Sequence, residues 1–99
     1  MKYRLDNGSL VNTEKAVARY SEATDWDGSN WISRNTGSQW EHEKLYKSKV
    51  AGWYLEAWSQ WQGSTPSARS LSEREAAEWL LLNDRDLPAE LAQYAEIEG

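Results

Sequence analysis

Residues 39–61 read QWEHEKLYKSKVAGWYLEAWSQW, and no other stretch constrains the fold of this chain as strongly. Two runs with alternating aromatic residues flank the segment KVAG, a pattern that predicts two antiparallel strands joined by a turn over 49–52. Gly52 supplies the positive φ that a tight turn uses. The predicted register has five pairs: Ser48 with Trp53, Tyr46 with Leu55, Lys44 with Ala57, His42 with Ser59, and Trp40 with Trp61.

Alternation along these strands divides their side chains between two faces. We expect the first face to form the core beneath a C-terminal helix; it carries Trp40, Tyr46, Trp53, Leu55 and Trp61. The second face carries Tyr54 and Trp58, which either are covered by an N-terminal unit, through Tyr20 and Val17, or stay exposed as interface anchors. We assign this face as a candidate partner-binding surface made of Tyr54, Trp58, Leu45, Lys47 and Glu56.

The N-terminal segment YRLDNGSLV predicts a β-hairpin. Its Asn-Gly pair at 7–8 favours a type I′ turn between two short alternating runs. Such a turn places Leu5 opposite Leu10 on an apolar side. It also places Tyr3 opposite Asn12, while the charged residues of the first strand point away.

Residues 12–23, NTEKAVARYSEA, predict an N-terminal helix. Asn12 or Thr13 can cap it, and apolar residues recur at helical spacing. Residues 24–38 then form a polar connection of a length that is often functional. Within it, Trp31 and Ile32 are either a short strand or a plug under the loop.

The C-terminal part predicts two helices. In LSEREAAEWLLLN, Ser72 and Glu75 have the spacing of a capping box. DLPAELAQYAEI follows as a shorter helix that folds back on the first, and the segment QGSTPSARS before both reads as a linker. The buried stripe of the first helix consists of Ala76, Trp79 and Leu80, with Leu82 or Asn83 at its end.

Together these elements predict a single α+β domain over residues 1–99. A small antiparallel β-sheet, built from the N-terminal hairpin and the Trp-rich central hairpin, packs with an N-terminal helix and two short C-terminal helices. The 99 residues include 7 Trp and 5 Tyr but no Phe, so the core depends on aromatic side chains with polar tips.

Composition also bears on the compartment. The chain has no Cys, which excludes disulfides and thiolate chemistry and suits a reducing cytosol. Its N-terminus, MKYRLDNGS, lacks the apolar run of a signal peptide, and no stretch approaches the ~18 apolar residues of a membrane span. We therefore expect a cytoplasmic protein without a membrane segment.

The net charge of -5 is unevenly distributed. Residues 71–99 hold eight acids and two bases, which gives -6 and leaves the first seventy residues at +1. The acids of the C-terminal helices either form a solvated face or imitate a phosphate backbone toward a basic groove. The candidate acidic surface consists of Glu73, Glu78, Asp84, Asp86 and Glu90.

Two stretches, EKLYKSKVAGWYLEAWSQWQGS and SEREAAEWLLLNDRDLPAEL, resemble short uncharacterised bacterial proteins. Such proteins are often encoded by phages or other mobile elements and have an "LY…G.WYL" hairpin before an "EAA.WLL" helix. The resemblance covers roughly residues 39–91 and carries over no catalytic residue and no ligand. It implies an accessory protein that acts on a bacterial host component.

Motifs for catalysis or metal binding are weak. His42 is the single histidine, and its neighbours Glu41 and Glu43 point to the opposite face of a strand, so we interpret it as a polar strand residue. DWDGSN at 25–30 fails the EF-hand spacing and suits Asx turns instead. We predict no metal and no cofactor.

The most favoured function is therefore that of a small acidic, non-catalytic protein-binding module that acts on a bacterial host component. One candidate for that action is inhibition of a host defence nuclease, as anti-CRISPR proteins perform. One alternative is a single-stranded nucleic-acid binder that uses the aromatic residues and lysines of the central hairpin, although nearby glutamates dilute the positive field. Carbohydrate binding and an enzymatic role for His42 are further alternatives. The sequence leaves the oligomeric state open.

Overall fold

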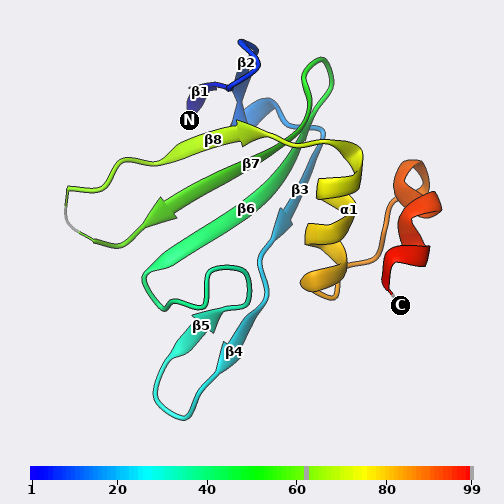
Figure 1. Cartoon of the computed structure of the whole chain (residues 1–99). Coiled ribbons are helices and arrows are strands. Elements are labelled where there is room, and N and C mark those ends of the chain that lie inside the picture. The colour runs from blue at the N-terminus through cyan, green and yellow to red at the C-terminus, as the bar shows by residue number, and fades with distance from the viewer. Residues whose placement is uncertain (62, 99) are drawn as a thin grey trace.

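The computed structural model describes residues 1–61 and 63–98 and has an α+β fold with antiparallel sheets (Figure 1). The central sheet has the strand order β3–β6–β7–β8: Ala18–Ser21, Glu41–Ser48, Gly52–Ser59 and Ser67–Ser70. Two separate hairpins are formed by β1 (Lys2–Arg4) with β2 (Leu10–Asn12), and by β4 (Thr24–Trp26) with β5 (Trp31–Ser33). The helical elements are α1 (Glu73–Leu82) and the 3-10 helices η1 (Thr13–Lys15) and η2 (Ala89–Glu98).

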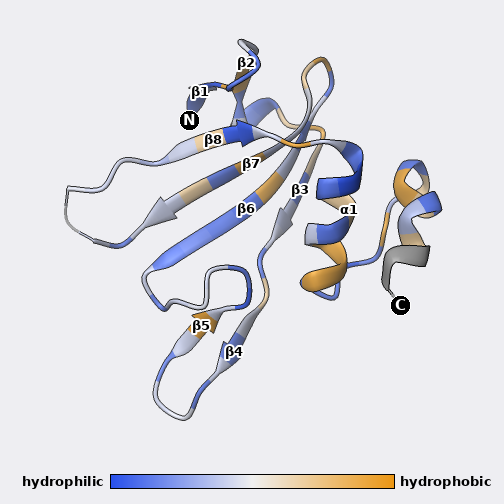
Figure 2. Ribbon diagram, viewed as in Figure 1, coloured by the Kyte–Doolittle hydropathy of each residue, from blue (hydrophilic) through white to orange (hydrophobic). Residues whose placement is uncertain are grey.

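Each face of the central sheet is covered by a different part of the chain. In Figure 2 the hydrophobic residues of β6 and β7 lie near α1 and the N-terminal hairpin. Helix α1 and η2 cover one face, where the buried cluster contains Leu45, Trp53, Leu55, Ala76, Ala77, Trp79, Leu80 and Leu91. The N-terminal hairpin covers the other face, where the buried cluster contains Leu5, Val11, Tyr46 and Tyr54.

The register of the central hairpin differs by one residue from the predicted one. Tyr46 lies opposite Tyr54, and Leu45 lies opposite Leu55. The physical reason is the length of the turn. Ser48 pairs with Gly52, so three residues, 49–51, join the strands instead of the predicted four. Ser48 Oγ accepts hydrogen bonds from two backbone N–H groups of that turn, and Gly52 adopts a φ of +80°.

This register changes the contents of both faces. Tyr46 moves to the face covered by the N-terminal hairpin, and Leu45 joins Trp53 in the core beneath α1. The prediction that Trp40 and Trp61 belong to that core is wrong, because both side chains are exposed.

The N-terminal hairpin forms where the sequence predicts it, but with another register, and the prediction that it belongs to the same sheet as the central hairpin is wrong, because β1 and β2 form a separate two-stranded sheet. Tyr3 pairs with Val11, and the chain turns through a longer loop that Leu5 N–H closes by donating to Ser9 O at 2.8 Å. Leu5 and Val11 are therefore buried, whereas Leu10, the predicted partner of Leu5, is 70% exposed.

The predicted helix over residues 12–23 is wrong. Only the single turn η1 is helical, and the chain continues as strand β3, which pairs with β6. Hydrogen bonds along the free edge of β6 outweigh the local helical pattern. Tyr20 consequently packs against Trp53, with ring centroids 6.1 Å apart, and Val17 is exposed, so neither residue covers Tyr54.

The C-terminal part follows the sequence more closely. Ser72 Oγ accepts from Glu75 N–H while the Glu75 carboxylate accepts from Ser72 N–H, which confirms the capping box. Ala76, Trp79 and Leu80 are buried as predicted; of the two alternatives for the end of the stripe, Asn83 is buried and Leu82 is exposed. The predicted linker contains strand β8, which pairs with β7, and the second helix is a 3-10 helix.

Candidate functional site

Two of the five predicted partner-binding residues are inaccessible. Tyr54 and Leu45 have no exposed surface, because the N-terminal hairpin covers the first and α1 covers the second. A side chain without exposed surface cannot contact a partner while the fold is intact. The expectation that these two residues form a docking surface is therefore corrected.

Glu56 serves the interior of the fold. Its carboxylate accepts hydrogen bonds from the Tyr3 hydroxyl at 2.5 Å and from the Tyr46 hydroxyl at 3.1 Å. Burial and the nearby Glu56 carboxylate raise the pKa of Tyr46 to about 12 and raise the pKa of Tyr3 as well. Glu56 thus attaches the N-terminal hairpin to the central sheet.

Lys47 and Trp58 are partly exposed but engaged within the chain. Lys47 forms an ion pair with Glu90 of η2 and lies 5.4 Å from the ring centroid of Trp53. Trp58 packs beside His42, with ring centroids 5.8 Å apart. The five predicted residues therefore do not form one surface.

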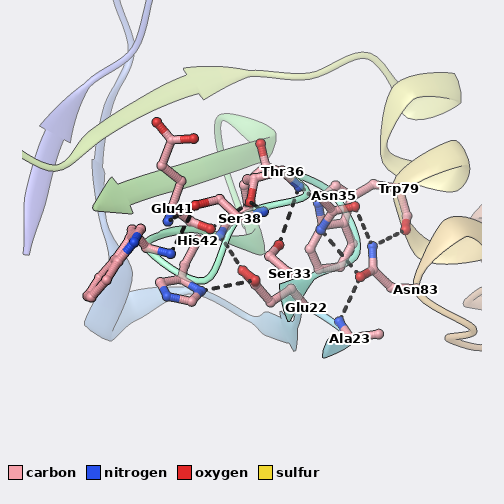
Figure 3. Close-up of polar contacts among 12 residues, drawn as sticks. Glu22, Ala23, Ser33, Asn35, Thr36, Ser38, Glu41, His42, Trp79 and Asn83 are labelled. Carbon is pink, nitrogen blue, oxygen red and sulfur yellow. Dashed lines mark hydrogen bonds and ion pairs between the residues drawn. The ribbon is translucent and has the colours of Figure 1, made fainter. Parts of the chain in front are cut away.

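His42 forms a contact with a carboxylate that the sequence did not reveal. Its Nδ1 lies 3.4 Å from Glu22 Oε2, and Glu22 Oε1 accepts a hydrogen bond from Glu43 N–H at 2.6 Å (Figure 3). His42 Nε2 is buried and has no hydrogen-bond partner in the described part of the chain. A proton-transfer role needs a nitrogen that a substrate can reach, so this arrangement fits a structural pair better.

The exposed aromatic surface lies instead in a segment that the sequence suggested was a connection. Residues 24–33 form a β-hairpin, here called the Trp hairpin, that extends away from the central sheet (Figure 1). Trp26 and Trp31 lie opposite each other at the ends of its strands, with ring centroids 5.3 Å apart. They are 55% and 60% exposed. Exposed aromatic pairs are typical of contact surfaces.

The turn of the Trp hairpin is held by local hydrogen bonds. Asp27 Oδ1 accepts from Ser29 N–H at 2.8 Å and from Asn30 N–H at 2.7 Å. This is the Asx turn that the sequence DWDGSN predicts, and Gly28 provides its positive φ of +102°. Those two backbone hydrogen bonds also lower the pKa of Asp27.

Arg34 connects the base of the Trp hairpin to the end of α1. Its guanidinium binds both carboxylate oxygens of Asp25, at 2.9 and 3.2 Å, and Asp84 Oδ2 at 2.6 Å. It also donates to the carbonyl oxygen of Leu82 at 3.2 Å. The hydrogen bond from Arg34 lowers the pKa of Asp25, which keeps this carboxylate ionised.

Asn83 makes a second connection in the interior (Figure 3). Its amide donates to Trp79 O at 2.7 Å and to Asn35 Oδ1 at 2.9 Å, and its Oδ1 accepts from Ala23 N–H at 2.7 Å. Ala23 precedes the Trp hairpin and Asn35 follows it, so one buried side chain fixes both ends of the hairpin. Rigid support of this kind lowers the entropy lost on binding.

A second exposed tryptophan pair lies at the outer end of the central sheet. Trp40 directly precedes β6, Trp61 follows β7, and their ring centroids are 5.1 Å apart. The sequence predicted that these two residues face each other, but as part of the core. The start of β6, the end of β7 and the Trp hairpin all lie away from the N-terminal hairpin (Figure 1).

The candidate acidic surface is partly neutralised. Glu78 pairs with Arg74, Glu90 with Lys47 and Asp84 with Arg34. Glu73 and Asp86 have no ion pair among the residues that the structure describes. Asp84 is the acid that the structure brings to the Trp hairpin.

The signal that could have revealed the Trp hairpin is present in the sequence. Residues 24–33, TDWDGSNWIS, place two short runs around a four-residue DGSN turn. Exposure of both tryptophans is not visible in this pattern, because strand alternation does not say whether a second layer covers a face.

Comparison with protein-family models, with characterised proteins and with solved structures finds no match to this chain. Within residues 1–61 and 63–98, no helix is long and apolar enough to cross a membrane. The same described residues contain no group of three or more His, Asp or Glu side chains placed to hold a metal ion.

Proposed function

We propose that this chain is a cytoplasmic, non-catalytic protein-binding module that contacts its partner through the Trp hairpin. The observation that carries the proposal is the pair of exposed indoles, Trp26 and Trp31, on a hairpin anchored to the domain through Asn83 and Arg34. Tryptophan, with Tyr and Arg, is enriched among the side chains that dominate binding energy. A preorganised hairpin retains more of that energy on association.

The charges around the tryptophan pair favour a positively charged partner. Asp25 and Asp27 belong to the hairpin, and Asp84 is attached to its base. The guanidinium of Arg34 is shared by two of these carboxylates, so the acids outnumber the bases. Arg or Lys side chains of a partner would meet both carboxylates and indole faces, and each cation–π contact at an exposed site is worth about 0.5–1 kcal/mol.

This charge pattern bears on the alternative of nucleic-acid binding. Phosphate groups would approach the same carboxylates, which repel them. A basic protein surface is therefore the better match. In the context of the mobile-element resemblance, the partner we propose is a bacterial host component with a basic groove, such as a defence nuclease.

The proposal is tested by capture from bacterial lysate. The bait proteins are the wild type, the variant Trp26→Ala/Trp31→Ala, and a matched control, Val17→Ala/Leu82→Ala, which also shortens two exposed apolar side chains. We expect the wild type and the control to retain one protein with a basic surface, and the tryptophan variant to lose it. Equal recovery by the tryptophan variant would reject this surface, provided circular dichroism shows that all three baits are folded.

The nucleic-acid alternative has its own test. The wild-type protein is mixed with single-stranded DNA and RNA at low salt, where phosphate contacts are strongest. We expect no mobility shift. A shift that Trp26→Ala/Trp31→Ala abolishes would replace the protein partner with a nucleic acid.

A further inference from the structure

The Trp hairpin is acidic, and the opposite end of the molecule carries a positively charged groove. The groove lies between the N-terminal hairpin and the turn that joins β6 to β7, both of which lie at the top of Figure 1. It has a volume of about 630 Å³. The residues that line it with apolar surface include Leu10, Val11, Ala16 and Val50.

Four cations line this groove, namely Lys2, Arg4, Lys15 and Lys49. In the described part of the chain none of them has an ion pair or a hydrogen bond from its side chain. The other cations mostly contact carboxylates, carbonyl oxygens or aromatic rings, as Arg34, Arg85 and Lys44 do. The free cations of a chain with net charge -5 are thus concentrated in one place.

The acids near the groove do not line it. Asp6 turns toward β8 and accepts hydrogen bonds from Ser70 N–H at 2.8 Å and Ser70 Oγ at 2.6 Å. Glu14 neighbours Lys15 in the chain but is not among the described residues that line the groove. A concave site bordered by charges of one sign concentrates ligands of the opposite sign.

Two of the apolar residues that line the groove are highly exposed. Val50, at the tip of the β6–β7 turn, is 94% exposed, and Leu10 of β2 is 70% exposed. The site therefore offers apolar surface and positive charge together.

We propose that this groove binds an acidic peptide segment of a protein partner, with apolar side chains that contact Leu10 and Val50. Carboxylates of the segment pair with the four cations. A nucleic acid fits the groove less well, because Tyr3, the one aromatic residue among the described residues that line it, packs against the Tyr46 and Tyr54 cluster and hydrogen-bonds to Glu56. A bilayer fits less well because it is flat and the apolar residues border a concavity.

This site is independent of the Trp hairpin, since it lies at the other end of the domain and selects the opposite charge. The first experiment is a selection of short random peptides on the immobilised wild-type protein. Peptides that also bind the variant Lys15→Glu/Lys49→Glu/Val50→Ser are removed. All three substituted side chains are exposed, so we expect the variant to keep its fold, which circular dichroism checks. We expect the remaining peptides to be rich in Asp and Glu with interspersed aliphatic residues.

The affinity of a recovered peptide is then measured by fluorescence anisotropy. We expect about tenfold weaker binding to the groove variant and less than about twofold weaker binding to a matched control, Arg69→Glu/Arg74→Glu/Leu82→Ser. Replacement of the peptide's acids by their amides is expected to abolish binding. The variant Trp26→Ala/Trp31→Ala is expected to bind this peptide like the wild type, which separates the two surfaces.

Several results would overturn the proposal. No enrichment over the groove variant, or enrichment of peptides without acids, would show that the groove does not select this chemistry. Equal loss of affinity in the matched control would show that net charge alone matters. Oligothymidine and phosphatidylglycerol vesicles are compared with the recovered peptide. If oligothymidine binds more tightly than the peptide, and its binding depends on Lys15 and Lys49, the groove is assigned to a nucleic acid instead. The same result with the vesicles would assign it to a membrane surface.

Discussion

Asn83, at the end of α1, accepts a hydrogen bond at 2.7 Å from the backbone N–H of Ala23, sixty residues earlier in the chain. The same side chain, only 1% exposed, exchanges hydrogen bonds with Asn35 and donates to Trp79 O. A single buried amide therefore terminates the helix and fixes both ends of the Trp hairpin. This relationship makes the hairpin's position depend on the C-terminal helix.

Substitution of Asn83 is expected to be costly. Asn83→Ala leaves Trp79 O without this donor in a buried position and leaves Ala23 N–H and the Asn35 amide without this partner in partly buried positions, and we expect a loss of about 1–3 kcal/mol in the free energy of unfolding. Asn30→Ala, in the exposed hairpin turn, should change it by less than about 0.5 kcal/mol. Urea denaturation measures both values. A similar small change for both variants would show that Asn83 does not anchor the fold.

Arg34 makes a different prediction, one about local motion. Arg34→Lys keeps the charge, but an ammonium lacks the guanidinium's planar set of donors. The lysine therefore cannot bind the two carboxylate oxygens of Asp25 and, at the same time, the carboxylate of Asp84. We expect amide hydrogen exchange in residues 24–33 to become about three- to tenfold faster in Arg34→Lys and in Arg34→Gln alike. Arg74→Lys, which alters an exposed pair within α1, is the control. Full protection in Arg34→Lys would show that charge alone suffices.

The outcome for each element follows from how local its determinants are. Helix α1 is predictable because Ser72 and Glu75 form its capping box within four residues of sequence. Strand β3 is not, because its conformation depends on pairing with the distant edge of β6. The register of the central hairpin depends on the length of its turn, which is one residue shorter than predicted. Because of this difference, Leu45 and Tyr46 each lie on the other face of the sheet from the one predicted.

The candidate site was harder to predict than the fold for a related reason. A sequence shows which aromatic residues share a face, but exposure depends on what other segments cover. Tyr54 is buried because the N-terminal hairpin, rather than a helix, lies over it. Trp26 and Trp31 are exposed because their hairpin extends from the sheet with no second layer among the described residues.

The division between core and surface in α1 can be tested with two leucines. Leu80 is fully buried against the sheet, and Leu82, two residues later, is 51% exposed. We expect Leu80→Ala to lower the free energy of unfolding by about 2–5 kcal/mol and Leu82→Ala by less than about 1 kcal/mol. Urea denaturation is again the measurement. Comparable losses would mean that the packed face of α1 is assigned incorrectly.

Two stacked tyrosines offer a sharper comparison. Tyr46 and Tyr54 lie with ring centroids 5.2 Å apart, but only the Tyr46 hydroxyl has a partner, Glu56, whereas the buried Tyr54 hydroxyl has none in the described chain. Tyr46→Phe should therefore cost about 1 kcal/mol, and Tyr54→Phe should be neutral or stabilising by up to about 1 kcal/mol. Equal destabilisation by both substitutions would contradict the hydrogen-bonding scheme.

The same tyrosines predict how stability depends on alkaline pH. The pKa of Tyr46 is raised from 10.0 to about 12 in the folded chain, chiefly by burial and then by the Glu56 carboxylate. The stabilisation linked to this raised pKa is therefore fully present below pH 10. It is lost as the pH rises from 10 through 12, because the unfolded chain releases the phenolic proton of Tyr46 at a lower pH than the folded chain does. Urea midpoints should fall more steeply over this range for the wild type than for Tyr46→Phe. Parallel pH profiles for the two proteins would show that Tyr46 titrates alike in the folded and unfolded states.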